Sequence, residues 1–185
     1  MSAAFSDTSP ETPLAQWKGC SAANFRAGRP TSFEPTAIVI HISEGCLSSA
    51  DSWFNNPDAQ VSAHYIVAKS GEIHQYVKER DTAFHAGAPL NPTWKLLRPK
   101  VNANWYTIGI EHEGKVEDAW PEAQYHASAQ LISDIARRWS IPVDADHLVL
   151  HREIHGDRSC PGFVFDRAKL LSLIATLAQP PATPT

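Results

Sequence analysis

Two histidines and one cysteine are the residues of this sequence that could together hold a metal ion. His41 and His151 each follow a run of apolar, β-branched residues, so each is expected to leave a sheet where a strand ends. Cys160 follows His151 by nine positions, in a segment whose glycines (Gly156 and Gly162) and proline (Pro161) allow it to fold back. Two neutral imidazoles and a thiolate suit zinc, and they leave the fourth tetrahedral position open for the water that hydrolysis requires.

The same residues also have a structural interpretation. The chain contains nine histidines, so chance combinations are many, and these donors are not at zinc-finger spacing. Core histidines and a cysteine acting as a small buried hydrophobe are common, and spacing alone favours that interpretation. A competing donor, His155, lies four positions after His151 and could bind metal if this segment were helical, but Gly156 argues against a helix.

The elements that must position these residues follow from hydrophobic periodicity. Short apolar runs predict strands, Lys69-Ser70-Gly71 predicts a hairpin turn, and apolar residues at three-to-four spacing predict a long helix. The predicted strands cover 37–42, 63–67, 72–77, 107–111 and 148–151, and the predicted helices cover 48–54, 121–140 and 166–177, the last with Asp166 as N-cap. We therefore expect an α/β fold, a single domain with a central mixed β-sheet flanked by helices.

The two ends of the chain differ from its middle. Residues 1–35 are rich in Ser, Thr, Pro and Ala and predict an irregular arm packed on the domain, while 179–185 predict a flexible tail. The domain that carries the candidate site is then expected to span 36–178. Within it, residues 86–106 contain three prolines and predict a long loop, which in a compact domain is usually functional or mobile.

Composition excludes several classes of protein. Of 185 residues, 43% are hydrophobic and 19% are charged, which is typical of a globular domain. A formal net charge of -4 without a basic run argues against a nucleic-acid partner, and three cysteines are too few for a disulfide scaffold. We recognise no export signal and no run of about 18 apolar residues. We expect a monomer made in the cytoplasm, with no membrane insertion.

Five sequence strings, in order along the chain, resemble one enzyme family. They read VIHISEG, VSAHYIVAKSGEIHQYV, AFHAGA, TIGIEHEG and LVLHREIHGDRSCPGF, and the similarity extends from about Ala37 to Phe163. Together they resemble the zinc-dependent N-acetylmuramoyl-L-alanine amidases (amidase type 2), a family that includes phage T7-type lysozymes, anhydro-muropeptide amidases and peptidoglycan recognition proteins. The resemblance implies that His41, His151 and Cys160 bind Zn2+, the last at a place where some members carry Asp.

The resemblance also implies roles for residues that bind no metal. Glu111 matches the catalytic carboxylate, although a strand-end Glu in a salt bridge is the structural alternative. Arg158 stands where the family usually has a lysine that stabilises the oxyanion, so the positive charge is kept but in a planar guanidinium group, and a solvated surface arginine is the alternative. Ala63 replaces the catalytic tyrosine of T7-type members, which favours the mechanism based on Glu111.

Two further histidines are candidates for substrate binding. The resemblance places His85 beside the substrate groove, where it could bind substrate or an intermediate, and the alternative is a histidine that anchors its loop. His64, next to Ala63, is the second candidate, and a supporting or structural role is its alternative.

The function implied by the resemblance is hydrolysis of the lactyl amide between N-acetylmuramic acid and L-alanine of peptidoglycan. Water on Zn2+ would attack the carbonyl, Glu111 would carry its proton to the leaving amine, and Arg158 would share the oxyanion with the ion. The expected partner is peptidoglycan or a muropeptide, and the expected setting is a phage endolysin or another wall-lytic enzyme released to the wall. The alternatives are a cytoplasmic amidase that recycles anhydro-muropeptides, a peptidoglycan-binding protein without catalysis, and a zinc peptidase, against which the absence of an HExxH string argues.

Overall fold

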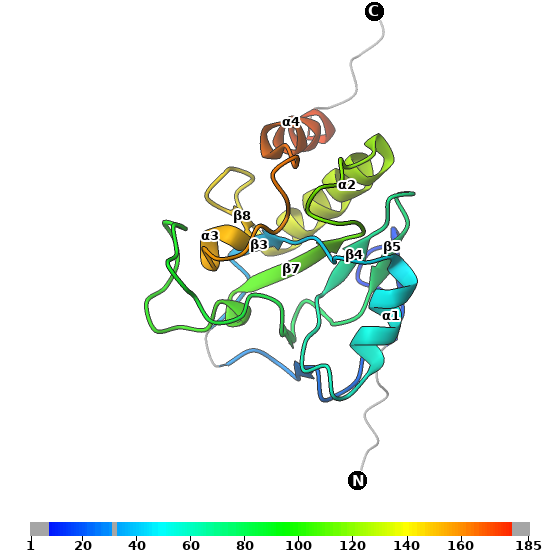
Figure 1. The fold of residues 1–185 in the computed structure, drawn as a ribbon, viewed down its shortest axis with the longest axis vertical. Helices are drawn as coiled ribbons and strands as arrows, with labels where there is room; N and C mark the ends of the chain where they lie inside the picture. Colours follow the sequence, from blue (N-terminus) through cyan, green and yellow to red (C-terminus); the bar gives the residue numbers. More distant parts are fainter. Residues whose placement is uncertain (1–7, 31–32, 179–185) are drawn as a thin grey trace, which may run out of the picture.

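A six-stranded mixed sheet forms the centre of the computed structural model, which describes residues 8–30 and 33–178 (Figure 1). In spatial order its strands are β1 (Ala15–Trp17), β5 (Ile73–Gln75), β4 (Tyr65–Val67), β7 (Thr107–His112), β3 (Ala37–Ile40) and β8 (Leu148–Leu150). The pair β4 and β5 is antiparallel, as expected for the predicted hairpin, and the other neighbours are parallel. The expected α/β class is therefore confirmed.

Two helices cover one face of this sheet. The helices α2 (Glu122–Trp139) and α4 (Arg167–Leu177) lie side by side at the top of Figure 1, and their apolar sides form the largest core cluster with the sheet. The sheet contributes alternate residues of its central strands, Ile38, Ile40, Ile108 and Ile110. Because side chains alternate along a strand, the residues between them point to the opposite face.

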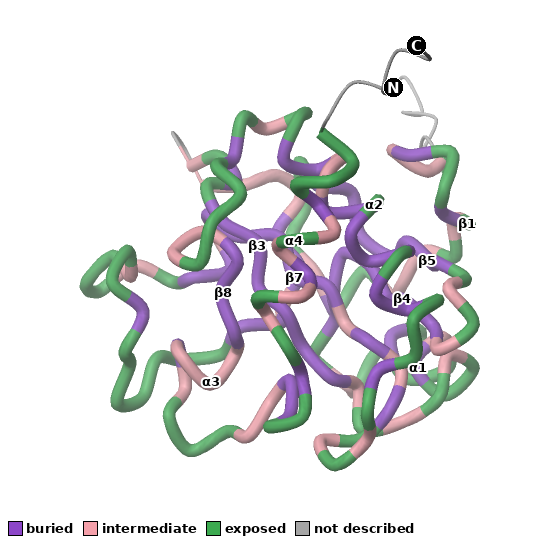
Figure 2. The backbone as a smooth tube through the Cα atoms, turned by 90° about the horizontal axis from the view of Figure 1, so that it is seen from above, coloured by how far each residue is buried: buried purple, intermediate pink, exposed green. Residues whose placement is uncertain are grey.

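The opposite face is covered by a short helix and by irregular chain. Helix α1 (Leu47–Asn55) packs at one end of this face, and the 3-10 helix η1 (Ala103–Trp105) closes the predicted long loop at the other. Trp94 anchors that loop, since its ring is 7% exposed and stacks on Tyr106 at 5.7 Å between centroids. Figure 2 shows the central strands as a buried band between more exposed connections.

The predicted helix boundaries agree closely with the structure. Helix α2 begins after Pro121 and ends before Ser140, which adopts the left-handed conformation with φ 54°. Asp166 caps α4 as predicted, with its side chain accepting a hydrogen bond from the Lys169 backbone N–H. None of the helices in the described residues combines the length and apolar composition needed to cross a membrane.

The structure corrects two expectations about local structure. The N-terminal segment is not wholly irregular, because β1 adds a parallel edge strand beside β5, and β2 (Phe25–Arg26) pairs with β6 (Thr82–Ala83). The strand predicted to end on His151 stops at Leu150, and His151 begins the one-turn helix α3 (His151–Ile154). The predicted tail at 179–185 lies outside the described residues.

Candidate metal centre and active site

Sheet register brings three distant polar residues into one row. Strand β3 pairs in parallel with β7 and β8, so that Ile40 lies opposite Ile110 on one side and Leu150 on the other. The residue that follows Ile40 is His41. In the same way, Glu111 follows Ile110 and His151 follows Leu150. Because the three strands are parallel, these side chains emerge together at the carboxyl edge of the sheet, where α/β folds place their sites.

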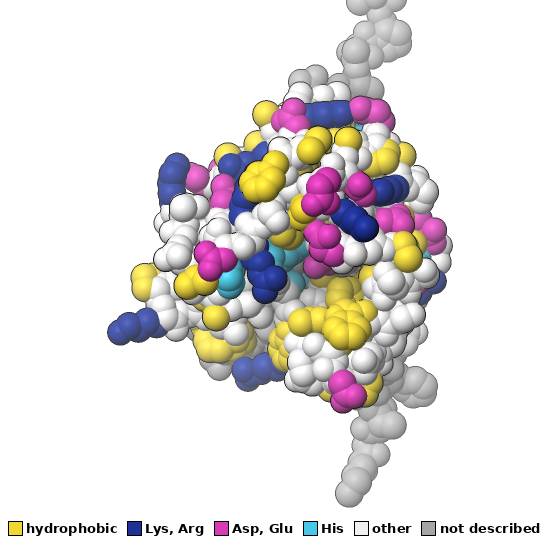
Figure 3. All heavy atoms as spheres, viewed as in Figure 1, with side chains coloured by type: hydrophobic (Ala, Val, Ile, Leu, Met, Phe, Trp, Pro, Cys, Tyr) yellow, Lys and Arg dark blue, Asp and Glu magenta, His cyan; other side chains and the backbone are white. Residues whose placement is uncertain are grey.

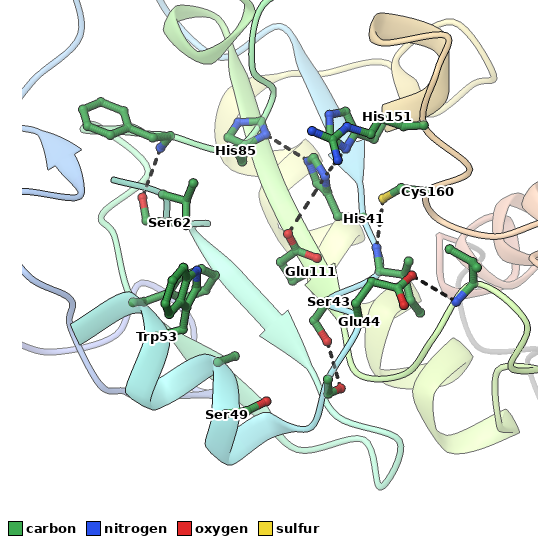
Figure 4. A pocket seen from close by; sticks show the side chains of 18 of the residues that line it. His41, Ser43, Glu44, Ser49, Trp53, Ser62, His85, Glu111, His151 and Cys160 are labelled. Carbon is green, nitrogen blue, oxygen red and sulfur yellow. Dashed lines mark hydrogen bonds and ion pairs between the residues drawn. The ribbon is translucent and has the colours of Figure 1, made fainter. Parts of the chain in front are cut away.

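The predicted metal donors converge at this edge. The Nδ1 atoms of His41 and His151 are 3.1 Å apart, and Cys160 Sγ completes a group whose donor atoms all lie within 4.8 Å of one another. The Ile42 backbone N–H donates to Cys160 Sγ at 3.1 Å, which holds the sulfur toward the histidines (Figure 4). The loop from His151 to Cys160 does fold back, since the Arg152 N–H donates to the Cys160 carbonyl at 3.0 Å.

This arrangement fits a tetrahedral zinc ion. Two nitrogen ligands of one zinc lie roughly 3.3 Å apart, given Zn–N distances near 2.0–2.1 Å, and the observed separation agrees with that value. His151 Nε2 is 3.2 Å from the Ala86 carbonyl, which can only accept, so the proton is on Nε2 and the Nδ1 lone pair points at His41. The donor elements therefore suit Zn2+, and so does the spacing of the two nitrogen atoms.

The protonation of the donors also matches metal binding. Burial first, and then the neighbouring imidazoles of His151 and His85, hold the pKa of His41 well below its usual value. Burial lowers the pKa of His151 to about 4, with Arg158 adding to the effect. Both imidazoles are thus neutral at physiological pH. Burial raises the pKa of the Cys160 thiol, so that binding a metal there would release its proton.

Glu111 stands beside the donors with an unused carboxylate oxygen. Its Oε1 is 4.0 Å from His41 Nδ1, and its buried Oε2 has no hydrogen-bond partner in the described part of the chain. Burial, and after it the negative charge of Glu44, raises the pKa of Glu111 to about 8. Among the described residues, the His41 ring is the one basic side chain within 4.0 Å of this carboxyl group, so no salt bridge to Lys or Arg accounts for its position. A carboxyl group poised near neutral pH is suited to proton transfer.

A pocket opens over this row of residues. Its volume is about 530 Å³, and Figure 3 shows histidine side chains at the bottom of a hollow on this face. The lining residues that bear on the site are His41, His85, Glu111, His151, Arg158 and Cys160, with Trp53, Val61 and Phe84 forming an apolar side. The site is therefore accessible to a substrate larger than water.

Arg158 and His85 both line the pocket, at different depths. Arg158 is an exposed side chain at the rim, close enough to lower the pKa of His151 by its charge. His85 is only 9% exposed, with its Nδ1 3.0 Å from His41 Nε2 and its Nε2 3.2 Å from Thr107 Oγ1. Burial and the charges of His151 and Arg29 lower the pKa of His85 to about 3.

Two other histidines do not reach the pocket. The substrate-binding prediction for His64 is not supported, because its side chain is fully buried and is absent from the pocket lining. His64 instead supports the strand beneath the site, with its Nδ1 accepting from the Gly109 N–H at 3.0 Å. His155 is absent from the donor group found among the described residues, although α3 does make a helical turn before it.

Several residues of the site had no role assigned from sequence. Glu44 and Trp53 carry no local signal, since an acidic loop residue and a helix tryptophan are ordinary. Thr107 and Gly109 could have been found, because they alternate with Ile108 and Ile110 and so share a face with Glu111.

Neutral nitrogen donors, a sulfur donor, a carboxyl group of raised pKa and an open pocket are together the features of a hydrolase active site that could hold a metal ion. The family model described as N-acetylmuramoyl-L-alanine amidase matches residues 31–163, which is most of the chain. The chain therefore belongs to the N-acetylmuramoyl-L-alanine amidase family.

Individual relatives agree with this assignment. The chain is 39% identical to N-acetylmuramoyl-L-alanine amidase A of Achromobacter lyticus over 145 residues, which cover 72% of each protein. It is 31% identical to the 1,6-anhydro-N-acetylmuramyl-L-alanine amidase AmpD of Salmonella typhimurium, over 80% of this chain and 84% of that protein. Among solved structures, AmiD from E. coli in complex with anhydro-N-acetylmuramic acid-L-Ala-D-gamma-Glu-L-Lys matches with a TM-score of 0.64 and 26% identity, over 78% of this chain and 59% of AmiD.

Proposed function

We propose that this amidase is zinc-dependent, with His41, His151 and Cys160 as its ligands and Glu111 as its catalytic carboxyl group. The observation that carries the proposal is the convergence of three metal-donor atoms beside a buried carboxylate oxygen that has no partner among the described residues. Leaving such an oxygen unpaired costs about 1–3 kcal/mol or more, and a fold retains that cost where the group acts on something bound.

The proposed substrate is the lactyl amide between N-acetylmuramic acid and L-alanine, in intact peptidoglycan or in a soluble muropeptide. Support comes from the relatives, since AmiD was solved with a muramyl peptide of this kind and AmpD is named for the anhydro form. The pocket of about 530 Å³ has room for the groups on both sides of the amide.

Each residue has a defined task in the proposed reaction. Zn2+ bound by these donors supplies Lewis acidity, which acidifies water and polarises a carbonyl oxygen. Glu111 accepts a proton from the attacking water and delivers it to the L-alanine nitrogen as the amide C–N bond breaks, which yields a lactyl carboxylate and a free amine. Arg158, at the rim, adds positive charge where the oxyanion develops.

Product analysis tests this proposal. Purified sacculi and soluble anhydro-muropeptides are incubated with the protein, with a chelator, and with the chelator followed by added zinc, and products are identified by mass spectrometry. We expect release of stem peptides that begin with a free L-alanine amine, loss of activity with the chelator, and recovery with zinc. Cleavage within the stem would instead identify a peptidase, and binding without cleavage would identify a recognition protein.

The same experiment addresses the biological setting. A wall-lytic enzyme is expected to process sacculi efficiently, whereas a recycling enzyme is expected to act on the soluble anhydro-muropeptide and to leave sacculi largely intact. We favour the wall-lytic setting, and preferential turnover of the soluble substrate would overturn that choice without affecting the amidase assignment.

A further inference from the structure

His85 contacts the predicted metal ligand His41, and the protein itself supplies a partner for each of its ring nitrogens. Its ring is nearly enclosed, at 9% exposed, and stands edge-on to the ring of His41 with 5.2 Å between centroids. Both of its nitrogens are used within the protein: Nδ1 is 3.0 Å from His41 Nε2, and Nε2 is 3.2 Å from Thr107 Oγ1. A side chain with no free polar atom has nothing left to offer a substrate.

The backbone fixes where the ring sits. A Cβ at Gly109 would lie only 2.4 Å from His85 Cγ, so the ring occupies the space that any other residue at this strand position would fill. His64 accepts a hydrogen bond from the Gly109 N–H at 3.0 Å, and its ring lies 5.7 Å from that of His85. The position of His85 is therefore determined by β7 and does not depend on a ligand.

The donor and acceptor of each hydrogen bond from Thr107 through His85 to His41 can be assigned by starting at Thr107. Thr107 Oγ1 is 2.7 Å from the Ala103 carbonyl, and since a carbonyl only accepts, the hydroxyl proton points there. Thr107 Oγ1 must then accept from His85, which places the His85 proton on Nε2. None of its partners among the described residues is a carboxylate that would stabilise a second proton, so Nδ1 is an acceptor and His41 must donate from Nε2.

The consequence reaches the metal donors. With its proton on Nε2, His41 presents the Nδ1 lone pair toward the Nδ1 lone pair of His151, which the Ala86 carbonyl holds in the same tautomer. Two lone pairs 3.1 Å apart repel each other, and a cation between them removes that repulsion. The chain of hydrogen bonds therefore prepares the site for a positive ion.

We propose that His85 is a positioning residue that links Thr107 to His41 through two hydrogen bonds, a chain that we call the relay. The relay holds the His41 imidazole in the tautomer and orientation that binds metal. The inference rests on the proposed zinc site, and it replaces the substrate contact expected for His85. Partners of this kind behind a metal ligand are typically worth about 10–100-fold in metal affinity.

Thr107 gives the sharpest test because it is fully buried and cannot touch a substrate. In Thr107→Val the acceptor for His85 Nε2–H is lost at nearly constant volume, whereas Thr107→Ser keeps it. We expect zinc affinity, measured by competition with a chromophoric chelator, to fall about 10–100-fold in Thr107→Val and to stay close to the unchanged protein in Thr107→Ser. Equal affinities in the three proteins, with folding confirmed by circular dichroism, would overturn the relay.

Nitrogen-15 NMR of the metal-free, unsubstituted protein provides a test that needs no variant. We expect His85, His41 and His151 all to carry their proton on Nε2, and a proton on His85 Nδ1 would refute the inference even if Thr107→Val failed to fold. The two proposals can fail separately. If the unsubstituted protein binds no zinc, the proposed metal site is wrong, and the histidine tautomers still test the relay. If it binds zinc but His85 carries its proton on Nδ1, only the relay is wrong.

Discussion

At the scale of single residues, the site consists of groups whose charged forms are disfavoured by burial. The thiol of Cys160, the imidazoles of His41 and His151 and the carboxyl of Glu111 are all held neutral by burial when no ion is present. An enzyme that needs such groups accepts a less stable metal-free fold, and a substitution of Glu111 measures this directly.

Replacing Glu111 by Gln is expected to stabilise the metal-free protein at high pH. The folded pKa of Glu111 is raised from 4.5 to about 8, so the folded state binds the proton more tightly than the unfolded state, and stability falls as pH rises between those values. The full shift corresponds to an upper bound of about 4–5 kcal/mol. Thermal unfolding of chelator-treated Glu111→Gln should therefore match the parent near pH 4 and exceed it near pH 9, while activity is lost.

The exposed Glu117 provides the matched control. Glu117→Gln should change neither the pH dependence of stability nor the activity. The quantity to compare is the melting temperature of Glu111→Gln minus that of the parent. If this difference is the same at pH 4 and at pH 9, the carboxyl of Glu111 is not held in the neutral form.

Replacing Cys160 is expected to separate ligand charge from ligand identity. Cys160→Ser should lower zinc affinity by more than the roughly 10–100-fold typical of an outer partner, because a neutral hydroxyl is a poor zinc ligand. Cys160→Asp should retain more affinity, since a carboxylate also binds zinc. Calorimetric titration at two pH values measures both, and binding by the parent should strengthen as pH rises because binding releases the thiol proton. The exposed Cys46, changed to Ser, should leave zinc affinity unaltered.

At the scale of elements, local sequence predicted most of the structure. The β-branched run before His41, the Gly71 hairpin and the apolar spacing of α2 each specify an element within its own residues, and each was placed within a residue or two. The strand β1 was missed because three residues at a sheet edge have no periodicity of their own and gain their hydrogen bonds from β5, which lies far along the chain. The same reason hid the relay through Thr107, which depends on a partner 22 residues away.

The C-terminal end of α2 offers a stabilising substitution. Ser140 adopts φ 54°, a conformation that costs an L-residue with a Cβ about 1 kcal/mol and costs glycine little. We expect Ser140→Gly to raise the free energy of unfolding by about 0.5–1 kcal/mol in urea denaturation, with unchanged amidase activity. Ser140→Ala keeps the strain and should show no gain, so a rise of equal size in both variants would contradict this reason.

At the scale of the whole molecule, the N-terminal segment is part of the domain that carries the site. The Arg29 guanidinium donates to the carbonyls of Asn104, Trp105 and Thr107 at 2.9–3.1 Å and contacts His64 Nε2 at 3.2 Å, so it ties this segment to the layer beneath the metal donors. Residues before 36 were predicted to lie on the domain, and a half-buried cation among backbone carbonyls could not have been inferred from the composition of that segment.

Removing this cation tests its structural contribution. Arg29→Met is expected to destabilise the protein by about 2–4 kcal/mol, because several carbonyls lose a charged donor and remain buried. The exposed Arg26, changed to Met, serves as the control and should cost under about 0.5 kcal/mol. Equal urea midpoints for the two variants would show that the contacts of Arg29 contribute little.

The separation of the two histidine donors along the chain has a consequence for folding. An ion bound by both His41 and His151 closes a loop of about 110 residues and links the end of β3 to the end of β8. Ligation then adds its free energy to that of folding, so apo protein should melt at a lower temperature than zinc-loaded protein, by a margin that grows with free zinc concentration. Metal supply would in that way control how much of the protein persists as well as how fast it works.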